Sequence, residues 1–471
     1  MSRKGDLCWR IAVGLVLAVL VAGGITYQLT RGDDPPTTQP ESPSRPPHVL
    51  FVVVDMLRAD HLSLCGYERP TTPNLNRLAR RPHVASTCRA YAPGTWTLPS
   101  HASFFTGEEV PVHGADSLGD PEGKQSVSLW GDPVRPLAAS LPTLAERFSN
   151  KGYRTVMVSG NPIVSRWAKT GLDRGFDVVE ESRSFGDLYG QNLITALERA
   201  LDRAGDDQPL FLFINICDAH HPWRAVPPGI KWVDPRPPLD NRPRFPETPY
   251  PRFLRGQMPA DEKAAFLEHA RDSYDHAVWR ADQTFGKLIQ TLKSRGVGQQ
   301  NYRLVVTSDH GEFLGEHDLL SHAIFVYEPD TRVPLIFLSS EAGGDVDFPE
   351  PISALTSHDL ALDGRLPEPA RPVRAVGYPD ALMGKLFGER LRATTAAWWF
   401  GNEKLFWIND QYSRFDLAAD TQEANPGPLP DEHPLRARFE AFVEQTRATA
   451  NRSSEPTPEM IEALRALGYV E

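Results

Sequence analysis

Residues 49–55 read VLFVVVD, and this stretch decides the fold that we expect for the rest of the chain. The run from Val49 to Val54 is apolar and mostly β-branched, which is typical of a strand that is buried on both faces of a parallel sheet. The run ends in the carboxylate of Asp55. Because open α/β sheets place their sites at the carboxyl ends of central strands, Asp55 is the first candidate site residue.

Two later stretches repeat this pattern of a buried strand followed by polar side chains. Residues 209–216 (PLFLFINI) and 302–307 (YRLVVT) both predict strands. The candidate metal ligands that follow these strands are Asp218, His220, His221, Asp309 and His310, and His322 comes twelve residues after His310. Because parallel strands end at the same edge of a sheet, we expect these side chains to lie near Asp55.

The rest of the chain alternates strands and helices until its character changes near residue 391. Further strands are expected over 155–159 and 332–338, and helices over 141–152, 187–203 and 261–294. Beyond residue 391, the aromatic runs at 398–400 and 404–407 flank a Gly-Asn turn and predict an antiparallel hairpin. Short helices are expected near 435–449 and 457–467. The sequence therefore predicts an α/β sandwich, with a mainly parallel sheet between helices, and a small antiparallel C-terminal subdomain.

Residues 95–107 (TWTLPSHASFFTG) read as a loop that passes into a helix. Pro99 suits the first helical turn, where its missing N–H costs nothing, and Gly107 ends the helix. Thr97 then lies at the helix N-terminus, where free N–H groups and the helix dipole favour an anion and ease deprotonation of a hydroxyl. Spacing alone favours a simple N-cap role for Thr97, so a chemical role depends on its neighbours.

Composition and charge describe an ordinary globular protein. The chain has 471 residues, of which 40% are hydrophobic and 24% are charged, and its net charge is -11. This charge argues against a nucleic-acid surface, because phosphate neutralisation needs clustered Lys and Arg. The length exceeds that of a single hydrophobic core, so we expect a catalytic domain over 48–385 and a C-terminal subdomain over 386–471.

The N-terminus predicts a membrane anchor. Basic side chains within residues 1–10 precede an uncharged run over 11–29 (IAVGLVLAVLVAGGITYQL) that is nearly long enough to cross a bilayer. The basic end should stay cytoplasmic. We therefore expect an uncleaved signal anchor, a proline-rich linker over 30–47 and a domain exported to the periplasmic or extracellular side. With Cys8 on the cytoplasmic side, at most one disulfide can form among Cys65, Cys88 and Cys217.

The side chains expected at the sheet edge are those of a metal site. Carboxylate and imidazole ligands suit zinc or manganese, and a hydroxyl bound beside them would be a nucleophile at neutral pH. One Asp-His pair at the end of a strand is weak evidence, because either residue is more often a satisfied polar group. Three strands that deliver the same chemistry to one edge are much stronger evidence for a site.

Several of these segments match a known family in residue type and in order. They are VVVDMLRADHLS (52–63), GYERPTTPNLNRLA (66–79), TWTLPSHASFFTG (95–107), VHGA (112–115), KGYRTVMVSGN (151–161), CDAHHP (217–222), VVTSDHGEFLGEH (305–317), RVPLIF (332–337), SRFDLAAD (413–420) and ALRALGYVE (463–471). The chain resembles the sulfatase-like branch of the alkaline phosphatase superfamily over nearly all of residues 48–471. The resemblance implies an alkaline-phosphatase-like fold and a metal held by Asp55, Asp309 and His310. It also implies that Thr97 is a nucleophile that contacts this metal.

At the site itself the chain departs from true sulfatases. Those enzymes carry Cys or Ser in a C/S-x-P-S/A-R pentapeptide and oxidise it to formylglycine, whereas residues 97–101 here read TLPSH. A secondary alcohol cannot become that aldehyde. The usual Asp-Asp pair is Asp55-Met56, and SGNP at 159–162 replaces the Lys-Trp-His segment that follows GYRT.

These departures resemble the threonine-nucleophile members of the superfamily. In that subgroup His220 and His322 would bind a second metal or the substrate oxyanion. The roles of Asp218 and His221 stay open between metal binding and hydrogen bonding within the loop.

The sequence thus predicts a membrane-anchored, metal-dependent hydrolase or transferase that acts on phosphate-type esters. Thr97 would attack the ester, and His220 or His322 would protonate the leaving group. One or two zinc or manganese ions would assist, and the substrate would be a small-molecule, glycan or lipid ester. Two alternatives stay open: a sulfuric ester hydrolase that works without formylglycine, and a non-catalytic, membrane-tethered binding protein.

Overall fold

The computed structural model describes residues 46–117, 127–129, 132–239, 249–299, 301–341, 346–379 and 388–450. The expected anchor over 11–29, most of the linker over 30–47 and the expected helix near 457–467 lie outside these residues. Among the helices that are described, none combines the length and the hydropathy needed to span a membrane. The anchor stays a prediction from sequence.

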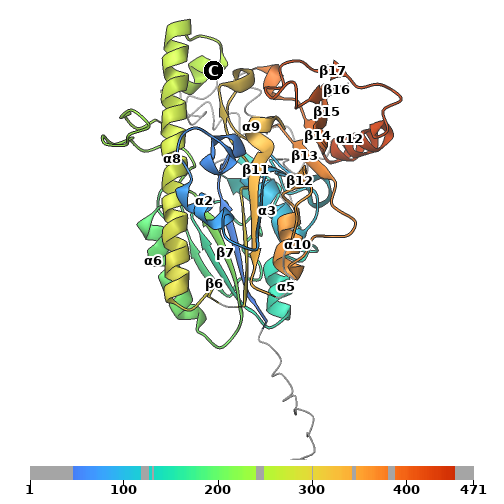
Figure 1. Ribbon diagram of the computed structural model, residues 1–471. Helices are drawn as coiled ribbons and strands as arrows, with labels where there is room; N and C mark the ends of the chain where they lie inside the picture. The colour runs from blue at the N-terminus through green and yellow to red at the C-terminus, as the bar shows by residue number, and fades with distance from the viewer. Residues whose placement is uncertain are drawn as a thin grey trace, which may run out of the picture. The chain divides into compact units, whose positions relative to one another are not determined.

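An eight-stranded sheet forms the centre of the domain (Figure 1). In order from one edge, its strands are β12 (Ile352–Ser353), β2 (Val84–Tyr91), β11 (Arg332–Ser339), β8 (Tyr302–Thr307), β1 (His48–Val54), β7 (Leu210–Ile216), β5 (Arg154–Ser159) and β6 (Val178–Glu181). β11 pairs antiparallel with both of its neighbours, and the other pairs are parallel. The three strands expected to carry the site, β8, β1 and β7, lie side by side, so the mainly parallel sheet is confirmed.

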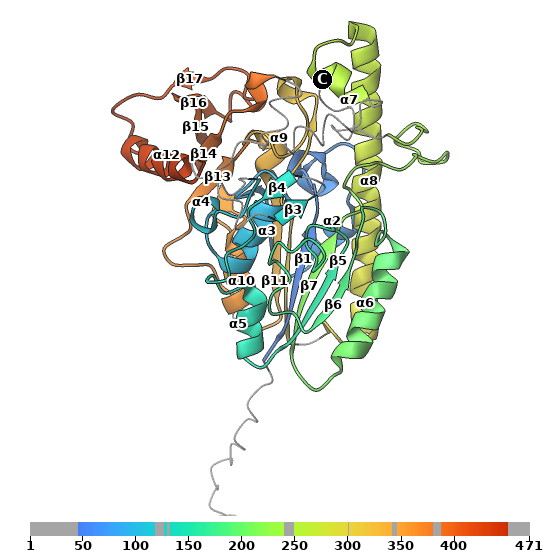
Figure 2. The same ribbon diagram turned by 180° about the vertical axis from the view of Figure 1, so that it is seen from behind.

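Helices cover both faces of this sheet, as Figures 1 and 2 show. The two faces of β1 feed two separate cores: residues 50, 52 and 54 contribute to one, and residues 49, 51 and 53 to the other. The first core is closed by α2 (Pro73–Ala79), α6 (Gln191–Ala204) and α8 (Ala260–Ser294), and the second by α3 (Thr97–Thr106), α5 (Leu144–Asn150) and α10 (Thr356–Asp363). The apolar run at 49–54 is therefore buried on both faces, as its composition predicted.

Short elements and a disulfide connect these layers. The short elements are α4 (Val110–His113), β3 (Val127–Leu129), β4 (Asp132–Val134), α7 (Pro249–Leu254), β9 (Phe313–Leu314), β10 (Leu320–Ser321) and α9 (Glu328–Thr331). Cys65 is bonded to Cys88, which joins the loop after β1 to β2. Cys217 is buried and forms no disulfide within the described residues.

The C-terminal part folds as a second, antiparallel sheet. Its strands are β13 (Val373–Gly377), β14 (Thr395–Phe400), β15 (Glu403–Ile408), β16 (Gln411–Asp416) and β17 (Gly427–Pro428), and α12 (Arg436–Ala450) packs against it. The expected hairpin is the β14–β15 pair, which turns at Gly401 and Asn402. This sheet begins with β13, ahead of the boundary expected between residues 385 and 386, and the division into domains stays a prediction.

Candidate active site

Two neighbouring strands end in a cluster of three buried, metal-type ligands. Asp55 follows β1, Asp309 and His310 follow β8, and all three side chains are fully buried. One potential ligand atom from each lies within 4.8 Å of the others. The strand ends that the sequence predicted to meet at the sheet edge are therefore together in space.

The atoms that face one another in this cluster have no hydrogen-bond partner among the described residues. They are Asp55 Oδ1, Asp309 Oδ2 and His310 Nε2. His310 Nε2 lies 3.8 Å from the Asp55 oxygen and 3.6 Å from the Asp309 oxygen. His310 Nδ1 donates to the Gly311 carbonyl over 2.9 Å, which leaves the lone pair on Nε2.

The protonation energetics of this cluster also favour a cation. Burial, and then the charge of Asp55, raises the pKa of Asp309 well above its usual range. Burial lowers the pKa of His310, so its imidazole is held neutral. The cluster thus holds two desolvated carboxylates that repel each other and one neutral, desolvated imidazole. This set of donors fits a divalent metal ion.

Thr97 lies beside this cluster, at the first residue of α3. The N-cap position belongs to Trp96, and no side-chain cap is formed there, so Thr97 is not the simple cap that its spacing alone favoured. Asn161 Nδ2 donates to Thr97 Oγ1 over 3.1 Å and to Asp55 Oδ2 over 2.6 Å. One amide thus ties the candidate nucleophile to a candidate metal ligand.

The sequence prediction did not include Asn161 or Asn215 as site residues. Asn161 lies just beyond β5, and Asn215 lies within β7, where its Nδ2 is 3.3 Å from Asp55 Oδ2. The signal that could have found Asn161 is the one used for Asp55, a polar residue at the carboxyl end of a parallel strand.

His101 occupies the position where sulfatases carry arginine. It is fully buried, its Nδ1 donates to the Thr97 carbonyl over 2.9 Å, and the same nitrogen lies 3.5 Å from Asp309 Oδ2. Burial lowers the pKa of His101 to about 4. A neutral ring therefore braces the first turn of α3 at this position.

A second cluster consists of His220, His221 and His322, which the structure also brings within ligand distance of one another. His220 Nδ1 donates to the His221 carbonyl over 2.6 Å, and its ring stacks on Phe185 at 4.1 Å between centroids. His322 Nδ1 hydrogen-bonds to the buried carboxylate of Glu312 over 2.8 Å. In His220 and His322 the remaining nitrogen, Nε2, is the one available to a ligand.

The two clusters are adjacent. The ring centroids of His310 and His322 are 4.4 Å apart, and those of His220 and His322 are 5.3 Å apart. The arrangement therefore offers ligands for one ion beside Thr97 and for a second charged group, an ion or a substrate oxyanion, beside the three histidines.

Asp218 is the one candidate that the structure directs away from both clusters. Its carboxylate accepts from the backbone N–H of Gly190 over 3.1 Å and from Arg280 over 3.1 Å. Of the two residues that the sequence left open, Asp218 holds a loop against α8, and His221 joins the histidine cluster.

Tyr274 of α8 clamps the loop that follows Asp55. Its hydroxyl donates to the Met56 carbonyl over 2.6 Å and accepts from the backbone N–H of Arg58 over 2.9 Å. Met56 has a φ of 58°, in the left-handed region that non-glycine residues rarely adopt. The backbone N–H of Met56 in turn donates to Asp309 Oδ1 over 3.3 Å. This strained residue therefore joins Asp55, its neighbour in the chain, to Asp309, the other carboxylate among the candidate metal ligands.

Comparisons with known proteins agree with this architecture. A family model described as Sulfatase matches residues 47–361. The chain is 24% identical over 403 residues to the uncharacterized sulfatase YidJ of Escherichia coli K12, which covers 72% of each chain. It is 22% identical over 312 residues to the phosphatidylethanolamine transferase Mcr-1 of Escherichia coli, covering 64% of this chain and 50% of that one.

Solved structures share the fold. The phosphonate monoester hydrolase of Agrobacterium radiobacter superimposes with a TM-score of 0.60 at 18% identity, covering 86% of this chain and 96% of that one. The matched family model spans well over half of this chain and contains both ligand clusters. The protein therefore belongs to the sulfatase family.

Proposed function

We propose that this protein is a metal-dependent enzyme that hydrolyses or transfers phosphate-type esters, with Thr97 as its nucleophile. The observation that carries the proposal is the position of Thr97 Oγ1. This oxygen shares the Asn161 amide with Asp55, beside three buried ligand atoms for which the described chain offers no hydrogen-bond partner. Buried polar atoms are normally paired, so orphaned atoms that converge beside a hydroxyl favour a bound cation and a reactive oxygen.

Asp55, Asp309, His310 and Thr97 would hold the first metal ion. His220 and His322, with His221 beside them, would hold a second ion or the substrate oxyanion. Zinc or manganese suits these carboxylate and imidazole ligands, and such an ion would supply positive charge for the developing oxyanion and favour the ionised hydroxyl.

The chain's own residues define the rest of the reaction. Thr97 Oγ1, its proton lost to solvent, would form a bond to the phosphorus while the bond from phosphorus to the ester oxygen breaks. In the form without a second ion, the leaving alcohol would take a proton from the protonated Nε2 of His220 or His322. Backbone N–H groups at the start of α3, at the positive end of the helix dipole, would stabilise negative charge on the phosphoryl oxygens. Water or an acceptor alcohol would then release the threonyl intermediate.

Two observations favour phosphorus over sulfur. Thr97 cannot become formylglycine, and His101 replaces the arginine of the sulfatase pentapeptide. The relative Mcr-1 carries the name of a transferase whose named lipid is a phosphate ester. Because the chain covers only half of that relative, we take from it the reaction class and leave the substrate open among small-molecule, glycan and lipid esters.

The proposal is tested by turnover of three aryl esters, a phosphate monoester, a phosphodiester and a sulfate ester, after a metal count on the purified protein. We expect bound metal, a preference for a phosphorus ester, and a loss of roughly 10³-fold or more in kcat for Thr97→Ala. Thr106→Ala is the matched control, because Thr106 is buried at the opposite end of the same helix.

Three outcomes would count against the proposal. A clear preference for the sulfate ester would establish the alternative of a sulfatase that works without formylglycine. Bound metal without any turnover would favour a binding protein. Equal activity of the Thr97→Ala and Thr106→Ala variants would remove Thr97 from the mechanism.

We also propose that residues 11–29 anchor the protein in a membrane and that the domain lies on the exported side. The sequence of that segment is the main support. The disulfide between Cys65 and Cys88 is in keeping with an oxidising compartment. Protease added to intact cells or spheroplasts should digest the domain, whereas protection until the inner membrane is lysed would contradict this orientation.

A further inference from the structure

We propose that a second pocket, separate from the proposed active site, binds a small molecule that carries two oxyanion groups. The pocket has a volume of about 470 Å³. Its walls come from the loop after β1, from α8, from residues 316 to 332 and from the loop after β16. No candidate metal ligand lines it, so this inference does not rest on the proposed reaction.

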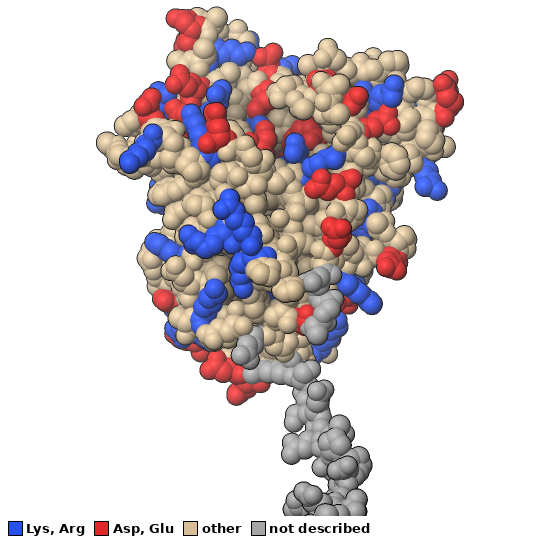
Figure 3. All heavy atoms as spheres, in the orientation of Figure 1, with Lys and Arg blue, Asp and Glu red and all other residues tan. Residues whose placement is uncertain are grey.

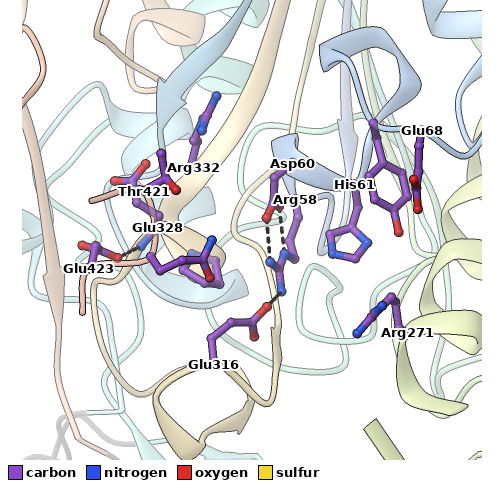
Figure 4. Close-up of a pocket in the computed structure, with 13 residues that line it drawn as sticks. Arg58, Asp60, His61, Glu68, Arg271, Glu316, Glu328, Arg332, Thr421 and Glu423 are labelled. Carbon is purple, nitrogen blue, oxygen red and sulfur yellow. Dashed lines mark hydrogen bonds and ion pairs between the residues drawn. The ribbon is translucent and has the colours of Figure 1, made fainter. Parts of the chain in front are cut away.

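Most acidic groups of the pocket already take part in ion pairs or hydrogen bonds within the protein. Arg58 donates to both oxygens of Asp60, at 2.9 and 2.7 Å, and pairs with Glu316 at 2.8 Å, as Figure 4 shows. Glu423 pairs with the buried Lys404 at 2.5 Å. The carboxylate of Glu328 accepts from Trp399 and Tyr91, over 2.7 and 3.1 Å. Four of the five carboxylates in the lining are therefore held by groups of the protein itself.

Two other cationic side chains of the lining, Arg332 and Arg271, keep N–H donors that no described residue accepts from. Arg332 uses only Nε, which donates to the Cys88 carbonyl over 2.8 Å, and no hydrogen bond joins its terminal nitrogens to a described residue. Arg271 makes no ion pair or hydrogen bond with a described residue. Thr421 and Gln422 add a hydroxyl and an amide to the same lining.

His61 points to a ligand independently of the arginines. The residue is only 7% exposed, and its Nδ1 is fixed by the fully buried Asp275 at 2.6 Å. Tyr67 packs on the ring, with 4.8 Å between ring centroids, and donates its hydroxyl to the same carboxylate. The ring orientation is thus set by Asp275 and Tyr67, no hydrogen bond joins Nε2 to a described residue, and His61 lines the pocket (Figure 4).

The placement of these groups defines the ligand. In Figure 4, Arg332 and Thr421 lie on one side, His61 and Arg271 lie on the other, and the ion pairs of Arg58 fill the space between them. A single small anion would meet one side only. A molecule with an oxyanion at each end and hydroxyl groups between fits both arginines, and its hydroxyls could donate to Asp60 and to Glu68 at the rim.

Binding of fructose 1,6-bisphosphate tests the proposal, with fructose 6-phosphate as the ligand that has one phosphate fewer. Titration calorimetry is run on the Thr97→Ala protein, so that the proposed active site cannot consume the ligand. We expect one bisphosphate per chain and at least tenfold weaker binding of the monophosphate. Arg271→Gln and Arg332→Gln should each weaken bisphosphate binding at least tenfold, and Lys287→Gln, an exposed change on the same helix as Arg271, should have no effect.

Two results would overturn the proposal. The first is an absence of saturable bisphosphate binding by a protein whose melting temperature shows that it is folded. The second is binding that the two arginine variants leave unchanged but that metal removal abolishes, since this would place the phosphates in the proposed active site instead.

Discussion

Asn161 Nδ2 lies 3.1 Å from Thr97 Oγ1 and 2.6 Å from Asp55 Oδ2, and it donates to both oxygens. Because the amide is the donor, the hydroxyl of Thr97 is held as an acceptor and its own proton must point elsewhere. The amide oxygen of Asn161 accepts from the backbone N–H of Ile163 over 2.8 Å, which fixes which way the amide faces. Asn161 is thus a rigid donor placed between a candidate nucleophile and a candidate metal ligand.

We expect Asn161→Ala to lower kcat by roughly 10- to 100-fold, the usual cost of losing a group that orients a metal ligand. The variant should still bind metal, because Asp55, Asp309 and His310 remain. Steady-state kinetics and a metal count measure the two effects separately. Asn76→Ala, which removes an amide on α2, is the control. A variant with unchanged kcat would show that the Asn161 amide only packs beside the site.

Tyr274→Phe should weaken metal binding while leaving the overall fold intact. The change removes one oxygen atom and leaves the Met56 carbonyl and the Arg58 N–H buried without their partner, at a cost of about 1–3 kcal/mol for each group. The loop that carries Asp55 should loosen, so we expect a metal dissociation constant roughly 10- to 100-fold higher. Saturating metal should restore most of the activity.

The control for this change is Tyr378→Phe. Tyr378 is equally buried, and its hydroxyl donates to the Thr446 carbonyl over 3.3 Å in the C-terminal part of the chain. Competition against a chelator of known affinity gives both dissociation constants. If the two variants hold metal equally well, the clamp on Met56 does not determine metal affinity.

The residues at the sheet edge could be predicted from sequence because the patterns that place them lie within short segments of the chain. An apolar run such as 49–54 predicts a buried strand, and parallel strands end at one edge, so Asp55 and Asp309 had to approach each other. The same logic gave the hairpin at β14 and β15. It missed β2, since VASTCRAY neither alternates strictly between polar and apolar residues nor carries a continuous apolar run.

The supporting residues could not be predicted this way. Tyr274 lies 218 positions from the carbonyl that it holds, and on the apolar face of a long helix a tyrosine reads as core. His61 is likewise fixed by Asp275, at a separation of 214 residues. Such contacts depend on how α8 lies against the loop after β1, which no spacing within either segment encodes.

Reduction of the disulfide should lower stability without dismantling the proposed site. Cys65 and Cys88 are separated by 23 positions, and a closed loop of this length contributes about 3 kcal/mol through the entropy of the unfolded chain. We expect a reductant to lower the melting temperature of the native protein and to leave the Cys65→Ser, Cys88→Ser double variant unchanged. No shift in the native protein would mean that this bond contributes little to its stability.

The buried carboxyl of Asp116 should make the stability of the protein depend on pH, and a single substitution should remove this dependence. This carboxylate accepts from Trp96 Nε1 over 2.7 Å and from the backbone N–H of Ser117 over 2.6 Å. Burial is the main cause that raises the pKa of Asp116 from 3.8 to about 7, and the hydrogen bonds from Trp96 and Ser117, followed by the charge of Arg135, oppose the shift only in part. Trp96 directly precedes Thr97, so this carboxylate also bears on the start of α3.

The sign follows from proton linkage. Below a pH of about 4 the carboxyl is neutral in both the folded and the unfolded chain. Between about 4 and about 7 only the folded protein keeps the proton, so the free energy of unfolding falls as the pH rises, by at most about 4 kcal/mol. Above a pH of about 7 both states have lost the proton, and the free energy of unfolding falls no further on account of this group. Asp116→Asn retains an oxygen that can accept from Trp96 and has no charge to bury.

We therefore expect Asp116→Asn to melt at the same temperature as the native protein at a pH of about 4 and at a higher temperature above about 7. Calorimetry across this range measures the difference directly. Asp363→Asn, at an exposed position on α10, should track the native protein at every pH. A difference between Asp116→Asn and the native protein that stays constant with pH would show that the carboxyl is ionised throughout and that its burial is compensated by its hydrogen bonds.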